Sequence, residues 1–204
     1  MSFNRAIALT ESQAGHYAGQ IAEGWDIGGN ANGGYLLALA ANGLRQHLGR
    51  PDPVSITAHY LRPGKVGPVA VHCETVKEGK RFATARATLE GPGFRNGDPR
   101  GIPEMRGYFR LPEEDPCSVL GLLLGLDAFP PTIFNANLPV AWTPTVELTC
   151  HLRCCPAPGW LRAPFATRVI SSGFLEEDGE LWDSTGQLVA QSRQLALVPK
   201  AATP

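Results

Sequence analysis

The stretch that decides the fold is GGNANGGYLLALAANGL, residues 28–44. It begins with glycine and asparagine, which is the chemistry of a turn. The part that follows, Tyr35–Leu44, is rich in alanine and leucine and has no β-branched residue, and apolar side chains surround it. It therefore predicts a helix that is buried on all sides. Gly49 and the Pro51/Pro53 pair predict where this helix ends.

Strands are predicted on both sides of this helix. One short strand is expected near Arg5–Leu9. Three more follow the helix, each rich in β-formers or alternating and each ending at a turn, at Val54–Leu61, Val69–Val76 and Phe82–Leu89. Residues 90–101 are rich in glycine, proline, asparagine and aspartate, and are the best candidate for a linker.

The same order recurs in the second half. Met105–Leu111 predicts a strand, and Cys117–Phe129 predicts a second apolar helix, N-capped by Asp115 with Pro116 in its first turn. Four more strands are expected, at Thr145–Arg153, Leu161–Ser171, Phe174–Asp183 and Leu188–Val198. A local echo of AHYLR (58–62) in CHLR (150–153) supports a repeat. Because a helix that is apolar all round needs cover on every side, we expect antiparallel sheets wrapped around the helices, an α+β fold.

The composition excludes several classes of protein. Hydrophobic residues make up 43% of the 204 residues, so a packed core is expected. The net charge of -1, with scattered basic residues, predicts no nucleic-acid partner. The five cysteines include no C-x-x-C pair, which argues against a disulfide framework and a zinc site. The longest apolar stretch, Val119–Leu126, is too short to cross a bilayer and no signal peptide is evident, so a cytoplasmic protein without membrane contact is expected.

Several segments resemble the TesB-like, type II acyl-CoA thioesterases. They are NGGY (32–35), SITAHYLRPG (55–64), ETVKEGKRFATAR (74–86), EDGELWDSTG (177–186) and VAQSRQ (189–194). The resemblance covers nearly the whole chain and implies a double hotdog, with repeats at 1–91 and 102–204 and a linker at 92–101. In one respect the chain departs from the family. The strand that normally follows Phe82–Leu89 is missing, so the first repeat is expected to be shortened.

The resemblance also implies a site. In the family an Asp on the second central helix, a Ser or Thr on the next strand and a Gln on the last strand position and polarise a water. The matching residues are Asp127, Thr145 and Gln194. Gly33 and Gly34 open the first helix, where backbone N–H groups suit the negative charge that a thioester carbonyl gathers, an oxyanion role.

Each of these residues also has a plainer interpretation. Asp127 would be a polar group near the unfavourable C-terminal end of a helix dipole, and Thr145 a good β-former. Gln194 would be a solvent-facing amide, and the two glycines a turn. His59 and His151 occupy equivalent strand positions and are interpreted as structural.

The function implied is hydrolysis of a fatty acyl-CoA by an activated water, with no metal or redox cofactor. One alternative is a hotdog hydratase or dehydratase acting on acyl thioesters, which would normally use an Asp/His pair. No His lies close to Asp127 in the sequence, which argues against this alternative. The other is a non-catalytic acyl-CoA-binding protein, which the shortened first repeat favours. Because hotdog sheets have open edges, we also expect a homodimer or larger homo-oligomer.

Overall fold

The structure is a computed structural model that describes residues 1–26, 29–80, 82–90, 104–111, 118–136 and 143–198. The first half contains α1 (Phe3–Ala6), β1 (Leu9–Gln13), β2 (His16–Ile21), α2 (Gly33–Leu48), β3 (Ser55–His59), β4 (Gly67–Glu78) and β5 (Ala83–Glu90). The second half contains β6 (Glu104–Phe109), α3 (Val119–Gly125), the 3-10 helix η1 (Thr132–Asn135), β7 (Thr145–Leu152), β8 (Leu161–Ser171), β9 (Phe174–Trp182) and β10 (Leu188–Leu197). The predicted linker at 92–101 lies outside the described residues.

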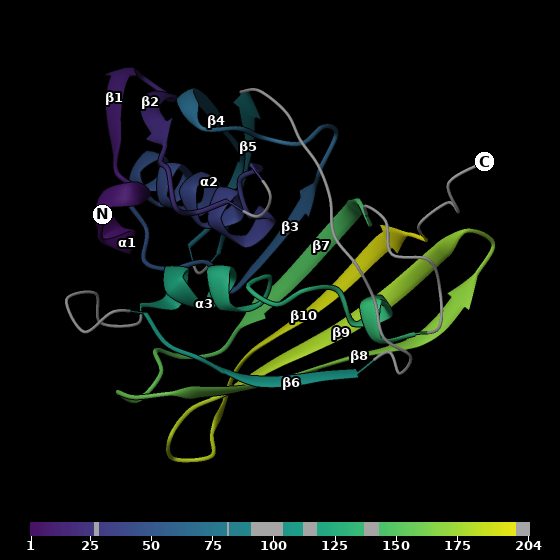
Figure 1. Cartoon of the computed structure of the whole chain (residues 1–204). Coiled ribbons are helices and arrows are strands. Elements are labelled where there is room, and N and C mark those ends of the chain that lie inside the picture. Colours follow the sequence, from purple (N-terminus) through teal and green to yellow (C-terminus); the bar gives the residue numbers. More distant parts are fainter. Residues whose placement is uncertain (27–28, 81, 91–103, 112–117, 137–142, 199–204) are drawn as a thin grey trace, which may run out of the picture.

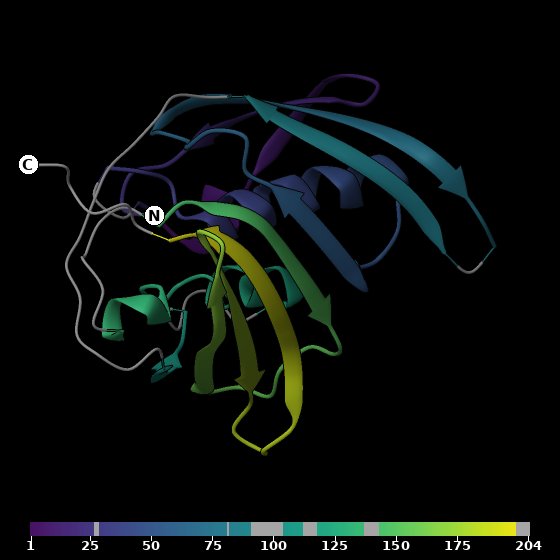
Figure 2. The ribbon, with the colours of Figure 1, turned by 90° about the vertical axis from the view of Figure 1, so that its right-hand side faces the viewer.

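Two antiparallel sheets enclose the helices (Figure 1). One has the order β1-β2-β4-β5 and the other β3-β7-β10-β9-β8-β6. In Figure 2 the strands of the first sheet lie above α2 and the green and yellow strands of the second lie below it. The helices contact each other, and a single hydrophobic cluster runs through both repeats. The α+β double-hotdog fold is therefore confirmed.

The central helix α2 begins and ends as local chemistry dictates. Asn32 is its N-cap, and its side-chain oxygen accepts a hydrogen bond from the Tyr35 N–H at 2.8 Å. Gly49 closes it in the left-handed conformation, with φ of 57°. Within it Leu37, Ala38 and Leu39 are buried, as predicted. Leu36 and Ala40 are only partly buried, so the prediction of a helix buried on all sides was wrong.

Two element predictions were wrong. The segment near Arg5–Leu9 begins as a helical turn, because Phe3 and Ala6, three residues apart, both turn into the core; the strand starts only at Leu9. The second helix is shorter than predicted, since Ser118 rather than Asp115 is its N-cap and its C-cap is Leu126. Asp115, Pro116 and Cys117 lie outside the described residues. Asp127 consequently follows the helix instead of lying on it.

The two repeats differ at one position in the sheet. In the second repeat β10 lies between β9 and β7 and hydrogen-bonds to both. Within the described ranges, the first repeat has no counterpart of β10 between β5 and β3. Strand β3 pairs instead with β7 of the second repeat, from Ser55 opposite His151 to His59 opposite Glu147. The repeats are thereby joined through their sheets, and one face of α2 is left without a covering strand.

Candidate functional site

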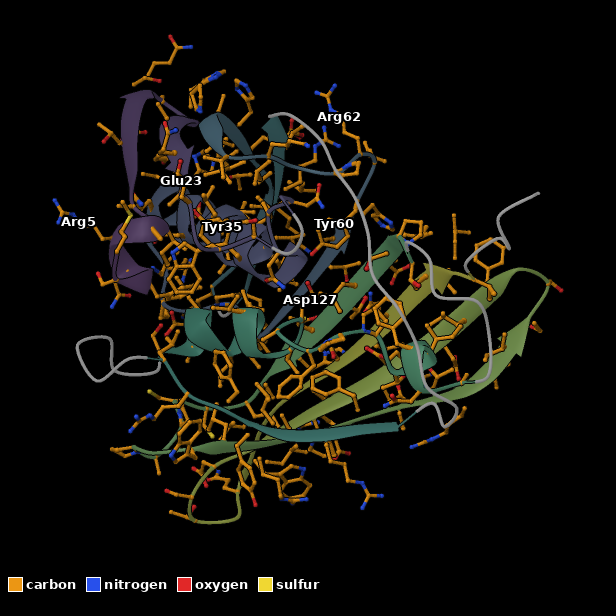
Figure 3. The ribbon with its side chains drawn as sticks, viewed as in Figure 1. Arg5, Glu23, Tyr35, Tyr60, Arg62 and Asp127 are labelled. Atoms are coloured by element: carbon orange, nitrogen blue, oxygen red, sulfur yellow. The ribbon has the colours of Figure 1, made fainter. Side chains whose placement is uncertain are left out.

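The carboxylate of Asp127 lies at the N-terminus of α2 (Figure 3). One of its oxygens accepts hydrogen bonds from the Gly34 N–H at 2.9 Å and from the Asn32 side-chain amide at 3.1 Å. The backbone of Gly33, beside it, also favours the charged form of this carboxylate. The N-terminus of a helix carries partial positive charge, so the α2 dipole stabilises the negative charge of Asp127. This holds although Asp127 also follows the C-terminus of α3, where the dipole is unfavourable to a carboxylate.

Asn32 joins the two repeats at this point. Its side-chain oxygen caps α2, which leaves its NH₂ group to donate to the Asp127 carboxylate and, at 2.5 Å, to the Asp127 backbone carbonyl. Both hydrogen-bonding ends of one amide are thus used, one within the first repeat and one across to the second. Sequence reasoning missed this residue, although an Asn directly before a Gly-Gly helix start is a recognisable N-cap signal.

Opposing effects set the proton affinity of Asp127. Burial raises its pKa to about 7, and the negative charge of Glu177 adds to the increase, whereas the N–H groups of Gly34 and Gly33 lower it. A carboxyl group with a pKa near 7 exchanges protons readily at neutral pH. It is suited to act as a general base.

Glycine is required at positions 33 and 34 because Leu123 and Asp127 of the second repeat approach the α2 backbone closely there. A Cβ on Gly34 would lie 2.3 Å from the Leu123 carbonyl oxygen, and one on Gly33 would lie 2.8 Å from the Asp127 carboxylate. Any side chain at Gly34 would therefore force α2 and α3 apart. Since the Gly34 N–H is engaged by Asp127 here, the oxyanion role of the two glycines stays a prediction.

Thr145 and Gln194 meet across neighbouring strands. The Gln194 amide donates to the Thr145 hydroxyl, from β10 to the start of β7. Gln194 is only 7% exposed, and β10 is an interior strand of its sheet. The interpretation of Gln194 as a solvent-facing edge residue is therefore wrong. The amide lies on the inner face, where it can contact a bound molecule.

A buried carboxylate, Glu177, lies beside this pair and was missed from the sequence. It is 6% exposed and stands opposite Gln194 in the β9–β10 register. Its oxygen accepts a hydrogen bond from the Thr132 N–H at 2.6 Å, and burial raises its pKa against that hydrogen bond. The signal was available, because alternation along β9 places Glu177 on the same face as Leu175 and Leu181.

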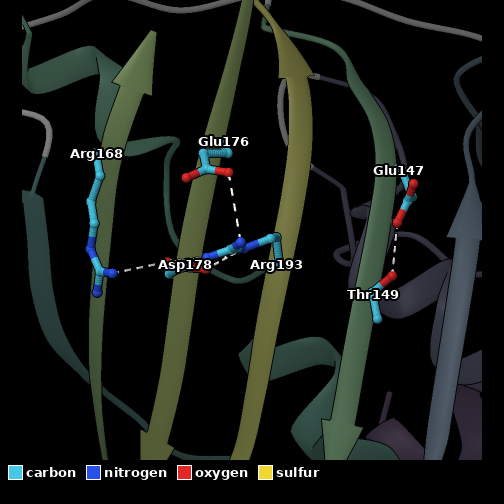
Figure 4. Close-up of polar contacts among 6 residues, drawn as sticks. All are labelled: Glu147, Thr149, Arg168, Glu176, Asp178 and Arg193. Atoms are coloured by element: carbon cyan, nitrogen blue, oxygen red, sulfur yellow. Dashed lines mark hydrogen bonds and ion pairs between the residues drawn. The ribbon is translucent and has the colours of Figure 1, made fainter.

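The outer face of the same strands has a different chemistry (Figure 4). Arg193 makes two hydrogen bonds to Asp178, at 2.8 and 2.9 Å, and lies 3.8 Å from Glu176, while Arg168 approaches Asp178 at 3.7 Å. On β7 the Thr149 hydroxyl donates a hydrogen bond to the Glu147 carboxylate. The two arginines and the carboxylates of β9 form a ladder of ion pairs on this surface. Their sequence neighbours point inward, so the period of two separates site from surface.

Tyr60 closes the first-repeat side of the site. Its hydroxyl donates to the Gly33 carbonyl oxygen at 2.9 Å. Burial raises the pKa of Tyr60 well above its usual value, and the nearby charge of Asp127 adds to this, so it remains a proton donor. His59, the preceding residue, is exposed, as is His151 between buried Cys150 and Leu152, which agrees with a structural interpretation of both.

The predicted residues therefore form two groups. Asp127 is held with Gly33 and Gly34, and Thr145 is held with Gln194; within the described residues no hydrogen bond joins the groups directly. Glu177 connects them, since it is paired in register with Gln194 and its charge acts on the pKa of Asp127. Over the same described ranges, no cluster of His, Cys, Asp and Glu is arranged to hold a metal ion. No described helix has both the length and the apolar character to span a membrane.

Comparisons with known proteins concern the family and the fold of the chain. The family described as the acyl-CoA thioesterase C-terminal domain matches residues 47–198. An uncharacterised protein of Mycobacterium tuberculosis is 26% identical over 266 residues, which cover 90% of this chain and 91% of the relative. That alignment is longer than this chain, so it includes sequence that only the relative has.

Solved structures share the fold over almost the full length. A Thermobifida fusca protein described as a thioesterase II superposes with a TM-score of 0.85 at 27% identity, covering 98% of this chain and 100% of that one. A protein from Alicyclobacillus acidocaldarius with a hot dog fold has a TM-score of 0.80 at 18% identity, covering 98% of each chain. The second likeness concerns the fold alone.

Proposed function

The chain belongs to the acyl-CoA thioesterase family, and from this membership we propose that it hydrolyses fatty acyl-CoA to the free acid and coenzyme A. A water activated by Asp127 is the nucleophile. The observation that carries the proposal is a buried carboxyl group with a pKa of about 7, fixed between the two repeats. No metal or redox cofactor takes part in the proposed reaction.

In the first step Asp127 accepts a proton from the water as its oxygen attacks the thioester carbonyl carbon. A C–O bond forms and the carbonyl π electrons move to oxygen. Thr145 and Gln194 orient the water, since a hydroxyl and an amide together offer both donors and an acceptor. In the second step the oxyanion collapses, the C–S bond breaks, and the proton held by Asp127 passes to the leaving sulfur.

Protonation of Asp127 has a second consequence in this proposal. A neutral carboxyl group is a weaker acceptor than a carboxylate. The Gly34 N–H is therefore released from Asp127 at the stage when the substrate oxygen becomes negative. The N–H groups of Gly33 and Gly34 stabilise that oxygen then, which would reconcile the predicted oxyanion role with the hydrogen bond that Gly34 makes before the reaction.

A second candidate is a protein that binds acyl-CoA without hydrolysing it. The missing strand of the first repeat favours it, because a shortened repeat still offers an apolar surface next to α2. The hydratase alternative loses support, since His59 and His151 are both exposed. For the cellular setting, we propose that the protein acts in the cytoplasm as a homodimer or larger homo-oligomer. A solely monomeric mass by light scattering at micromolar concentration would contradict that assembly.

Thiol release from a panel of acyl-CoAs, measured beside binding of a non-hydrolysable acyl-CoA analogue, separates the two candidates. We expect release of free thiol with saturation kinetics. Tight binding of the analogue with no thiol release from any acyl-CoA would favour the binding protein. Neither binding nor release would remove both.

A further inference from the structure

A groove of about 1160 Å³ lies over α2, where the described part of the first repeat has no strand between β5 and β3. The edges of β3 and β5 face each other across it, and among the described residues each is paired on its other side only, β3 with β7 and β5 with β4. In the second repeat the equivalent position between two strands is filled by β10. The groove is thus a consequence of the difference between the two repeats.

The floor of the groove is an apolar stripe on α2. Leu36, Ala40, Leu44 and Leu48 recur every four residues, line the groove and are partly exposed, whereas Leu37 and Leu39 between them are buried. Residues spaced by four lie on one face of a helix. This face is the part of α2 that a covering strand would bury. Binding of an apolar ligand that removes this face from water is therefore favourable.

One end of the groove reaches the candidate site. The side chain of Tyr60 contributes to the groove wall, and its hydroxyl bonds to the Gly33 carbonyl oxygen. The Gly34 N–H donates to the Asp127 carboxylate, and Gly33 lies beside that carboxylate. Tyr60 therefore lies both at the end of the groove and close to the proposed base, since its hydroxyl and the Asp127 carboxylate both approach Gly33; Figure 3 shows the two side chains.

A cation stands at the same end. Arg62 is exposed, lines the groove and has no ion-pair partner within the described part of the chain; Figure 3 shows it directed outward. The other arginines of the groove are all paired, in Arg45–Asp52, Arg50–Glu78 and Arg86–Glu74. An apolar floor that ends beside a base and an unpaired cation matches a ligand with an apolar tail, a reactive group and a phosphorylated head.

We propose that this groove binds the acyl chain of a long-chain acyl-CoA, with the thioester at the Tyr60 end and the coenzyme phosphates near Arg62. The inference rests on the proposed function and adds the class of substrate to it. From Leu36 to Leu48 the helix rises about 18 Å at 1.5 Å per residue. A zigzag of bonds of about 1.5 Å advances roughly 1.25 Å per carbon, so the stripe accommodates an acyl chain of about 14 carbons.

The first test fills the groove from its floor. Ala40→Phe places a ring over the stripe, and we expect kcat/KM for tetradecanoyl-CoA to fall about tenfold, equivalent to ~1.4 kcal/mol, with that for butanoyl-CoA nearly unchanged. Ala87→Phe fills the groove from β5 and should shift the chain-length profile in the same way if the first variant fails to fold. The matched control is Gln46→Phe, on the same helix but exposed and away from the groove.

The second test concerns the head group. Arg62→Gln should raise KM for tetradecanoyl-CoA several-fold and leave KM for the N-acetylcysteamine thioester, which has no phosphates, unchanged. Arg168→Gln, which removes a paired arginine on the outer face of β8 and away from the groove, is the control. An equal effect of Arg62→Gln on both thioesters would overturn the placement of the coenzyme.

The outcomes separate this inference from the proposed function. If the wild type hydrolyses acyl-CoAs but both groove-filling variants keep its chain-length profile, the groove inference fails and the function stands. If there is no turnover, yet binding of a non-hydrolysable tetradecanoyl-CoA weakens in both variants, the function fails and the groove inference stands. A change of assembly mass in both variants, with acyl-CoA kinetics unaltered, would show that a second copy occupies the groove and overturn the inference.

Discussion

In the second repeat β10 lies between β9 and β7, whereas in the first repeat β5 and β3 face each other across a groove. The difference shows in the helices. Every residue of α3 from Leu120 to Gly125 is buried, but α2 leaves its stripe from Leu36 to Leu48 partly exposed. Omitting one strand from a sheet that wraps a helix turns a core face into an accessible apolar surface.

The two repeats also contribute different parts of the candidate site. The second repeat supplies the side chains Asp127, Thr145 and Gln194, and the first supplies a helix N-terminus with its Asn32 cap. Because the two repeats supply different parts, the geometry of the candidate site depends on the contact between α2 and α3 as much as on any single side chain. The predictions below test that comparison.

The largest effect is expected from Asp127→Asn. The change keeps the shape of the side chain and removes its basicity, so kcat should fall about a hundredfold or more. Affinity for a non-hydrolysable acyl-CoA should change little. Steady-state hydrolysis and binding on one preparation check this, with Asp178→Asn on the outer face of β9 as the matched control. A folded Asp127→Asn variant with wild-type turnover would end the assignment of the base to the second repeat.

Gly34→Ala should be the most destabilising of the small changes. Its methyl group would meet the Leu123 carbonyl, a backbone atom that cannot move aside, and overpacking of this kind costs about 1–3 kcal/mol. Gly43→Ala on the same helix meets only side chains, the nearest at 3.1 Å, and gains helix propensity, so it should be close to neutral. Denaturant unfolding of both variants decides this. Equal stabilities would mean that the helix contact is looser than described.

The pH dependence of the rate should report the carboxyl group at the boundary of the repeats. Because the base must be ionised, kcat/KM should rise with pH and reach a plateau at high pH. The midpoint of the rise should lie near the pKa of Asp127, about 7. Glu177→Gln removes a negative charge that raises this pKa, so its midpoint should move to lower pH. Glu176→Gln, on the outer face, is the control. A midpoint that moves upward in Glu177→Gln would contradict the placement of Glu177 beside the base.

The smallest effect concerns stability. The pKa of Asp127 is raised in the fold, from 3.8 to about 7, so folding favours its protonated form. The contribution of Asp127 to the free energy of unfolding is therefore largest below pH 3.8 and is lost as the pH rises towards 7. The Asp127→Asn variant does not lose stability in this way. Its Tm relative to wild type should be higher at pH 8 than at pH 5, by a few degrees, since 1 kcal/mol corresponds to about 2–4 °C at this size. A Tm difference that is constant with pH would indicate an unshifted carboxyl group.

Much of this molecule was predictable from patterns that act over short distances. The all-apolar run after Gly34 indicated a central helix, alternation located the strands that follow each helix, and the order of elements indicated two repeats. The strand β2 (His16–Ile21) was missed. These predictions succeeded because the periods of helix and strand are properties of neighbouring residues. The same local reasoning failed at Phe3–Ala6 and at the start of α3, where burial and capping by Ser118 decided the outcome.

Only the tertiary structure decided the partners of the polar groups. Asp127 accepts hydrogen bonds from Asn32 and Gly34, which are 95 and 93 residues away in the chain. Glu177 on β9 accepts one from Thr132 on η1, 45 residues away. It also decided that the glycines serve a close helix contact and that β3 pairs with the other repeat. No periodicity encodes such choices, because they depend on which surfaces remain open after local structure has formed and on the need of each buried charge for a hydrogen-bond donor.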